Sequence, residues 1–87
     1  DVYKRQVRVR PLPGELARVE KLITEIDEIV QCDKVTGDDA FVCRMHLRGI
    51  EELDHCLRKI ASFATTSTSI VKSTLVSNRL LPLDGAD

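Results

Sequence analysis

This 87-residue sequence has few aromatic side chains, contains no tryptophan and carries no excess of either charge. It contains two Phe, one Tyr and a formal net charge of −1, from 13 Lys and Arg against 14 Asp and Glu. Domains that bind nucleic acid usually present a basic face or stacking aromatic rings. The composition therefore argues against a domain that binds DNA or RNA by itself.

Long apolar runs are also missing. No run approaches the roughly 18 residues of a membrane-spanning helix, and no signal-peptide pattern opens the chain. The three cysteines, Cys32, Cys43 and Cys56, are odd in number and fall within predicted regular elements, unlike the frameworks of small secreted domains. We therefore expect a cytoplasmic protein that does not contact a membrane. Because residue 1 is Asp rather than Met, we also expect a fragment or a processed chain.

The length predicts a single domain over residues 1–87, with a core of about residues 7–76 and an irregular extension over residues 77–87 that contains Pro82 and Gly85. A domain of this size buries a small core, so oligomerisation would help to stabilise it.

The first half of the sequence predicts a strand, a helix and a second strand. Val7-Arg8-Val9-Arg10 alternates with the valines inward, and the predicted strand ends near Arg10. Pro13 suits the first turn of the helix that follows. One face of that helix carries apolar residues at spacings of three, four and three, namely Leu16, Val19, Ile23 and Ile26. The second predicted strand covers residues 29–36, with Val30 and Cys32 on one face and Gln31 and Asp33 on the other.

The second half repeats this order after a tight turn at Gly37-Asp38-Asp39, a composition typical of a hairpin connection. The clearest strand follows, with an inward set of Phe41, Cys43, Met45 and Leu47. Gly49 is predicted to cap a second helix, whose apolar face is Ile50, Leu53, Leu57 and Ile60. β-branched residues then predict a last strand over residues 65–76.

Two strand-helix-strand units predict an α+β fold, the ferredoxin-like βαββαβ sandwich, with an antiparallel four-stranded sheet and both helices on one face. The other face would mix Val35, Val42, Ile70 and Val71 with hydroxyl, Arg and His side chains. Such a surface is suited to burial against a second copy of the same sheet. We therefore expect a homodimer.

Three stretches, in this order, resemble the C-terminal effector-binding domain of Lrp/AsnC transcriptional regulators over about residues 7–81. They are Ile29-Val30-Gln31-Cys32-Asp33-Lys34-Val35-Thr36-Gly37-Asp38, then Gly49-Ile50-Glu51-Glu52-Leu53, then Thr66-Ser67-Thr68-Ser69-Ile70-Val71. Asp39 and Ala40 depart from the family's turn, which usually has an aromatic residue and then Asp at these positions.

The resemblance implies a domain that dimerises through its sheets, assembles into an octamer of four dimers and binds an amino acid where dimers meet. The effector-binding residues it implies are Thr36, Gly37, Asp38, Asp39 and Ala40 of the turn, with Thr66, Ser67, Thr68 and Ser69 of a neighbouring subunit. A small zwitterion suits this set, because backbone N–H groups and carboxylates would hold its two charges. No cofactor is implied. DNA binding would require a helix-turn-helix domain, which these residues lack.

Four alternatives were weighed: a metal site, a redox pair of cysteines, an enzyme, and an oligomerisation module without a ligand. Metal binding is disfavoured because Cys43 and His46 point to opposite faces of one strand, and His55 and Cys56 diverge on a helix. Cys32 and Cys43 are expected to lie close across the hairpin as small buried side chains rather than as a redox pair. An enzyme on a dimeric ferredoxin-like barrel, or an oligomerisation module without a ligand, would share the fold, but no nucleophile-base pair or phosphate-binding loop is present.

Overall fold

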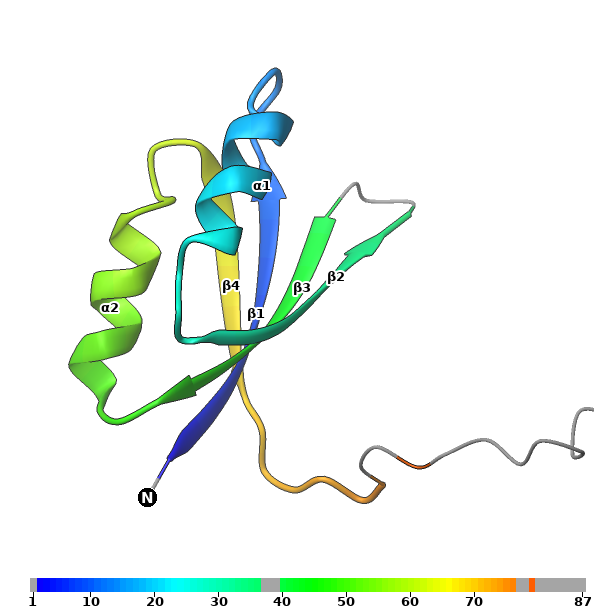
Figure 1. Cartoon of the computed structure of the whole chain (residues 1–87), viewed down its shortest axis with the longest axis vertical. Helices are drawn as coiled ribbons and strands as arrows, with labels where there is room; N and C mark the ends of the chain where they lie inside the picture. Colours follow the sequence, from blue (N-terminus) through cyan, green and yellow to red (C-terminus); the bar gives the residue numbers. More distant parts are fainter. Residues whose placement is uncertain (1, 37–39, 77–78, 80–87) are drawn as a thin grey trace, which may run out of the picture.

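A computed structural model describes residues 2–36, 40–76 and 79 of the chain. Its elements are β1 (Tyr3–Pro11), α1 (Leu16–Thr24), β2 (Ile29–Val35), β3 (Ala40–Leu47), α2 (Ile50–Arg58) and β4 (Ala64–Ile70). The strands form one antiparallel sheet in the order β2-β3-β1-β4, and both helices lie on the same side of it (Figure 1). The predicted ferredoxin-like βαββαβ arrangement is confirmed.

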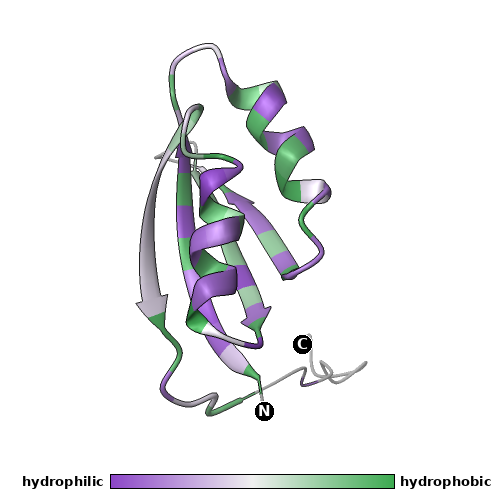
Figure 2. Cartoon of the chain, turned by 90° about the vertical axis from the view of Figure 1, so that its left-hand side faces the viewer, coloured by the Kyte–Doolittle hydropathy of each residue, from purple (hydrophilic) through white to green (hydrophobic). Residues whose placement is uncertain are grey.

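The core lies between the helices and one face of the sheet. Alternate residues of the two central strands fill it, so that β1 and β3 alternate between hydrophobic and hydrophilic residues in Figure 2, whereas β4 is pale along most of its length. Both helices contribute, through Val19 and Ile23 on α1 and Cys56 on α2. The buried cluster consists of Val7, Val9, Val19, Ile23, Ile26, Phe41, Cys43, Met45, Leu47, Cys56, Ile60 and Ala64. The inward set predicted for β3 is therefore confirmed.

The start of α1 differs from the prediction. The helix begins at Leu16, with Glu15 at the N-cap, so Pro13 lies in the preceding turn rather than in the first helical turn. In the turn between β1 and α1, Gly14 has a φ of +83°, a left-handed conformation that glycine adopts without steric cost. The positive φ at Gly14 separates Pro13 from the helix.

A bulge in β2 changes the faces predicted for that strand. The pairing register with β3 shifts between Ile29 and Gln31, so one residue is inserted without a partner. Val30 is 52% exposed, while Cys32 packs against the core. The prediction that Val30 and Cys32 share a face was therefore wrong, because the bulge interrupts the two-residue period.

Two predictions in the second half also fail. Of the apolar face predicted for the second helix, Ile60 is buried and Leu53 and Leu57 pack against the core, but Ile50 is 74% exposed, and Cys56 is buried in addition. The last strand ends at Ile70, and residues 71–76 leave the sheet as an irregular segment. Gly49 does precede α2 in extended conformation, and the Arg48 N–H donates to the Glu52 carboxylate, which closes the first turn.

The face predicted for Ile70 is likewise wrong. Ile70 pairs with Arg5, which pairs with the buried Met45, so all three lie on the helix side of the sheet. Val42 lies on the opposite, helix-free face, opposite Arg8 and Asp33. The helix-free face is thus less apolar than predicted.

Candidate functional site

The predicted effector turn joins β2 to β3 at one end of the sheet. Val35 and Ala40 form the last pair of the β2–β3 ladder, so Thr36 and Ala40 bracket the connection. Thr36 is exposed and the side chain of Ala40 is buried. Gly37, Asp38 and Asp39 lie outside the described residues. The structure therefore places the two ends of the predicted turn at a sheet edge, next to the start of β3.

The predicted hydroxyl residues all lie on β4, the edge strand at the other side of the sheet. Their side chains alternate between its two faces. Thr66 and Thr68 pair with Val9 and Val7 and share the helix side with them. Ser67 and Ser69 pair with Arg8 and Gln6 on the helix-free face. A ligand on one face would therefore meet only half of the predicted hydroxyls.

The described ends of the turn and the hydroxyl strand lie on opposite edge regions of the sheet. Phe41, Val9 and Thr66 form one row across β3, β1 and β4, so Thr66 lies at the same end of the sheet as the turn. However, β3 and β1 separate β2 from β4, and three strand spacings amount to about 14 Å. Thr36 and Ala40 therefore lie too far from the β4 hydroxyls of the same chain to share one small molecule with them.

A cavity of about 140 Å³ lies at this end of the sheet. Its lining consists of Arg8, Arg10, Thr65, Thr66 and Ser67. The arginines come from β1 and the hydroxyls from β4, which are adjacent antiparallel strands. Thr65 and Ser67 share the face of the two arginines, whereas Thr66 contributes from the strand edge. Two guanidinium groups beside two hydroxyl groups suit a carboxylate, because guanidinium binds carboxylates through two parallel N–H donors.

Arg8, Arg10 and Thr65 were not predicted as site residues. The alternation Val7-Arg8-Val9-Arg10 places both arginines on one face, but the sequence does not state that this face pairs with the hydroxyl strand. Only the pairing of Arg8 with Ser67 and of Arg10 with Thr65 brings these side chains together.

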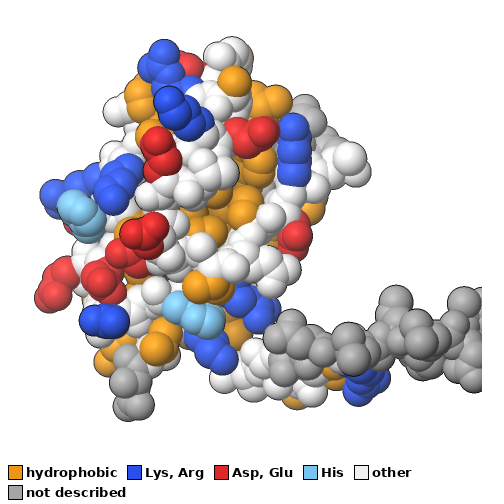
Figure 3. All heavy atoms as spheres, in the orientation of Figure 1, with side chains coloured by type: hydrophobic (Ala, Val, Ile, Leu, Met, Phe, Trp, Pro, Cys, Tyr) orange, Lys and Arg blue, Asp and Glu red, His pale blue; other side chains and the backbone are white. Residues whose placement is uncertain are grey.

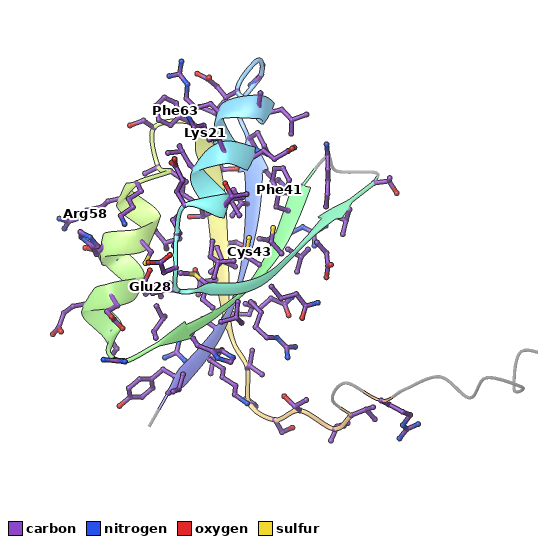
Figure 4. All side chains as sticks on the ribbon, in the orientation of Figure 1. Lys21, Glu28, Phe41, Cys43, Arg58 and Phe63 are labelled. Carbon is purple, nitrogen blue, oxygen red and sulfur yellow. The ribbon has the colours of Figure 1, made fainter. Side chains whose placement is uncertain are left out.

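The cysteines lie in the core. Cys43, labelled in Figure 4, is directly opposite Cys32, and the two Sγ atoms lie 3.3 Å apart, as predicted for neighbours across the hairpin. Burial is the main cause that raises the pKa of both thiols. Within residues 2–36, 40–76 and 79, no three His, Cys, Asp or Glu side chains are grouped to hold a metal ion.

Cys56 is linked to the loop between α1 and β2. Burial raises its pKa to about 11, and its hydrogen bond to the Glu28 carboxylate acts in the same direction. The pKa of Glu28 is lowered, first by a hydrogen bond from the backbone and then by the one from Cys56. This pair fixes the loop against α2 and leaves the thiol protonated at neutral pH.

Neither helix of the described part of the chain is long and apolar enough to span a bilayer.

A family model described as the Lrp/AsnC ligand binding domain matches residues 6–81 of the chain. No curated protein sequence matches significantly. Among solved structures, LrpC of B. subtilis superimposes with a TM-score of 0.77 at 16% identity, covering 88% of this chain and 54% of LrpC. The feast or famine regulatory protein Rv3291c of M. tuberculosis, solved in complex with L-methionine, gives 0.73 at 21% identity, covering 91% of this chain and 56% of that protein.

A third similar structure has a different extent. TTHA0845 of Thermus thermophilus superimposes with a TM-score of 0.71 at 23% identity, over 86% of this chain and 99% of TTHA0845. The chain thus spans about half the length of LrpC and Rv3291c and nearly all of TTHA0845. At these identities the likenesses establish a shared fold.

Proposed function

The chain belongs to the Lrp/AsnC ligand-binding domain family, and from that premise we propose that it senses a small amino acid and couples its binding to the assembly of several copies. The domain acts by binding rather than by catalysis. The observation that carries the proposal is the cavity of about 140 Å³ lined by two arginines and three hydroxyl residues.

The chemistry of this cavity fits one end of a zwitterion. Arg8 and Arg10 supply the positive charge that a carboxylate requires, and Thr65 and Ser67 supply hydroxyl donors on the same face of the sheet. The ammonium group would then pair with Asp38 or Asp39 of the predicted turn. The complex of Rv3291c with L-methionine supports an amino acid as the class of ligand.

The spacing of the two halves supports a ligand held between copies. About 14 Å separates β2 from β4 within one chain, which exceeds the length of a small amino acid. We therefore propose that Thr36, Ala40 and the turn residues of one copy face Thr66, Ser67, Thr68 and Ser69 of another. In this arrangement, homodimers paired through the helix-free face associate further, toward the octamer that the family resemblance implies.

DNA binding belongs to a different part of the regulator in this proposal. The described residues form a sensor and an oligomerisation unit over one domain, whose core is about residues 7–76. A helix-turn-helix domain in the same or a partner chain would read DNA, and the arrangement of the sensor domains would set the spacing of its half-sites.

Titration of the purified chain with the 20 amino acids tests this function. A ligand that binds the folded, assembled form raises its stability by about 2.7 kcal/mol at a hundredfold excess over the dissociation constant. Because the ligand bridges copies, light scattering should show an increase in assembly size at the same concentration. Ser67→Ala and Thr65→Val should reduce both effects.

The matched control is Ser73→Ala, since Ser73 is exposed and lies outside the cavity. This variant should respond to the amino acid like the original chain. If none of the amino acids changes the melting temperature or the assembly size, the proposed function is wrong.

A further inference from the structure

Two thiols form a cross-strand pair in the β2–β3 hairpin. Cys32 and Cys43 are directly opposite each other, and the Cys43 thiol donates a hydrogen bond of 3.3 Å to the Cys32 Sγ. The third cysteine, Cys56, bonds instead to the Glu28 carboxylate. The sequence alone favoured inert side chains over a redox pair, because it does not give the register of β2 against β3.

The backbone at this pair is of the kind that accommodates a disulfide. The His46 N–H donates to the Glu28 carbonyl oxygen, on the β2 side of β3. Because backbone N–H groups alternate between the two sides of a strand, those of Cys43 point toward β1 instead. Cys32 and Cys43 are therefore a non-hydrogen-bonded pair, for which the Cα atoms lie about 4.5 Å apart. Disulfides require a Cα separation of about 4.4–6.8 Å.

The two sulfur atoms need only a small movement to bond. A disulfide has an S–S distance of about 2.0 Å, so the Sγ atoms, which are 3.3 Å apart, must approach by about 1.3 Å. Rotation about the Cα–Cβ bond of the half-buried Cys32 can supply this approach, whereas Cys43 is 0% exposed and held in the core. The strands therefore keep their register when the bond forms.

The pair lies on the side of the sheet that carries the helices. Cys43 belongs to the buried cluster, and Cys32 packs against that cluster from the edge strand β2. A second copy on the helix-free face therefore leaves the pair uncovered. In Figure 3, hydrophobic side chains remain visible between α1 and the outer strands of the sheet, so the helices leave this corner partly open to a small oxidant.

Cys32 is the thiol that ionises first. Burial raises the pKa of the Cys32 thiol, and the hydrogen bond from Cys43 acts in the opposite direction. Burial also raises the pKa of the Cys43 thiol, and its hydrogen bond to Cys32 adds to the rise. Because only a thiolate attacks an oxidant, Cys32 is the point of reaction, and burial makes the reaction slow at neutral pH.

We propose that peroxide joins Cys32 and Cys43 in a reversible disulfide that fixes the β2–β3 hairpin. The Cys32 thiolate attacks one oxygen of hydrogen peroxide, the O–O bond breaks, and a sulfenic acid and one water form. The Cys43 sulfur then attacks the Cys32 sulfur, the S–O bond breaks, and the Cys43 proton leaves with a second water. Two thiols and one peroxide thus give one disulfide and two waters, and dithiothreitol reverses the bond by thiol–disulfide exchange.

The crosslink acts close to the predicted effector turn. It lies three residue pairs from Val35–Ala40, the last pair before the turn. The edge strand β2 is paired with β3 alone and is interrupted by a bulge. A disulfide prevents β2 from separating from β3 and therefore restricts the base of the turn. Formation of the bond does not depend on the proposed amino acid function.

Treatment of the whole chain with millimolar hydrogen peroxide at pH 8, followed by mass spectrometry, tests the proposal. The protein should lose the mass of two hydrogen atoms and keep one free thiol for alkylation. Trypsin cleaves after Lys34 and Arg44, so the peptides that contain Cys32 and Cys43 should stay joined until dithiothreitol is added. Electrophoresis without reductant should show no linked copies.

The decisive variant is Cys32→Ser, which should abolish the crosslink. The matched control, Cys56→Ala, removes a different buried thiol and should still form it. Circular dichroism checks that both variants fold, and the peptide mapping of the original chain stands without them.

A second measurement reports on the hairpin itself. Asp33 and Val35 belong to hydrogen-bonded pairs with β3, since they alternate with Cys32 along β2. Oxidation should slow hydrogen exchange of their amides at least tenfold in the original chain and in Cys56→Ala, but not in Cys32→Ser. It should also raise the guanidinium midpoint of the same two proteins, because the closed loop restricts the unfolded chain.

Four outcomes would overturn the inference. They are three free thiols after prolonged treatment, over-oxidation of Cys32 without a crosslink, a crosslink that includes Cys56, and amide exchange in β2 that is the same before and after oxidation. None of these measurements requires an amino acid, so failure of the effector proposal and failure of this one remain distinguishable.

Discussion

The free energy of unfolding should fall steeply between pH 8 and pH 10, because two core thiols resist ionisation in the folded chain. Cys43 and Cys56 are 0% and 1% exposed, and burial is the first cause that raises the pKa of each above its ordinary value of 9.0. In the unfolded chain both thiols lose their protons near pH 9. The folded state therefore binds more protons than the unfolded state, and its stability falls as pH rises from about 9 to about 11.

The size of the effect follows from proton linkage. Consider a thiol that stays protonated in the folded state and has a pKa of 9.0 in the unfolded state. At pH 10 it lowers the free energy of unfolding by about 1.4 kcal/mol. At pH 8 the corresponding loss is below about 0.1 kcal/mol. The two thiols together should lower the free energy of unfolding by about 2.7 kcal/mol, a large part of the roughly 5–15 kcal/mol typical of a domain.

Guanidinium denaturation followed by circular dichroism at pH 8, 9 and 10, with a reductant and at one protein concentration, measures this fall. The double variant Cys43→Ala with Cys56→Ala should start less stable at pH 8, because it leaves small cavities in the core. Its free energy of unfolding should then change much less with pH. Both proteins have the same lysines and tyrosine. If the free energy of unfolding falls equally with pH in both proteins, the thiols are not the cause of the fall.

Four further outcomes follow from the packing. Met45→Ala should cost about 3 kcal/mol in denaturation experiments, since Met45 is 1% exposed at the centre of the core. Gly14→Ala should cost about 1 kcal/mol in the same assay through backbone strain alone, because φ is +83° and a Cβ would contact nothing within 4 Å. Val42→Lys should shift the light-scattering mass toward the monomer at unchanged circular dichroism, because a second copy is proposed to cover Val42. Arg58→Ala should alter the melting temperature by less than about 1 °C, since the Arg58–Asp54 pair is exposed.

The regular helices and strands could be predicted because the spacing of apolar residues that marks a buried face lies within a single element. Phe41, Cys43, Met45 and Leu47 alternate without interruption, and the buried face of β3 follows directly from that alternation. Val19 and Ile23 likewise mark the inner side of α1. Each of these patterns is complete within one element and does not depend on a neighbour.

Where the packing against an adjacent strand or layer determines which side of an element is buried, the sequence alone was insufficient. The bulge beside Val30 depends on how β2 fits β3, and the face of Ile70 depends on the register of β4 against β1. Ile50 was predicted inward with Leu53, Leu57 and Ile60, but it is exposed, whereas those three pack in or against the core together with Cys56. The position of a helix on its sheet is a property of the packed layers.

The candidate site also combines residues predictable from local motifs with residues that only contacts between strands bring together. Thr36, Ala40 and the hydroxyls of β4 could be proposed from their motifs, whereas the contribution of Arg8 and Arg10 emerges only when β1 pairs with β4. Likewise, Lys4 and His46 at the other end of the sheet become neighbours only when β1 pairs with β3. Charges that are distant in the sequence cannot be summed by face until the strand order is known.

The two outer strands of the sheet also have a consequence for solubility. β2 carries a bulge and exposes Asp33 and Lys34, while β4 presents a row of small hydroxyl side chains over residues 65–69. An edge that is bulged or charged is a poor template for another strand, and a row of small hydroxyl side chains does not form a dry contact between sheets. Concentrated solutions of the chain should therefore resist conversion into cross-β fibrils, although both outer strands offer free backbone hydrogen-bonding groups.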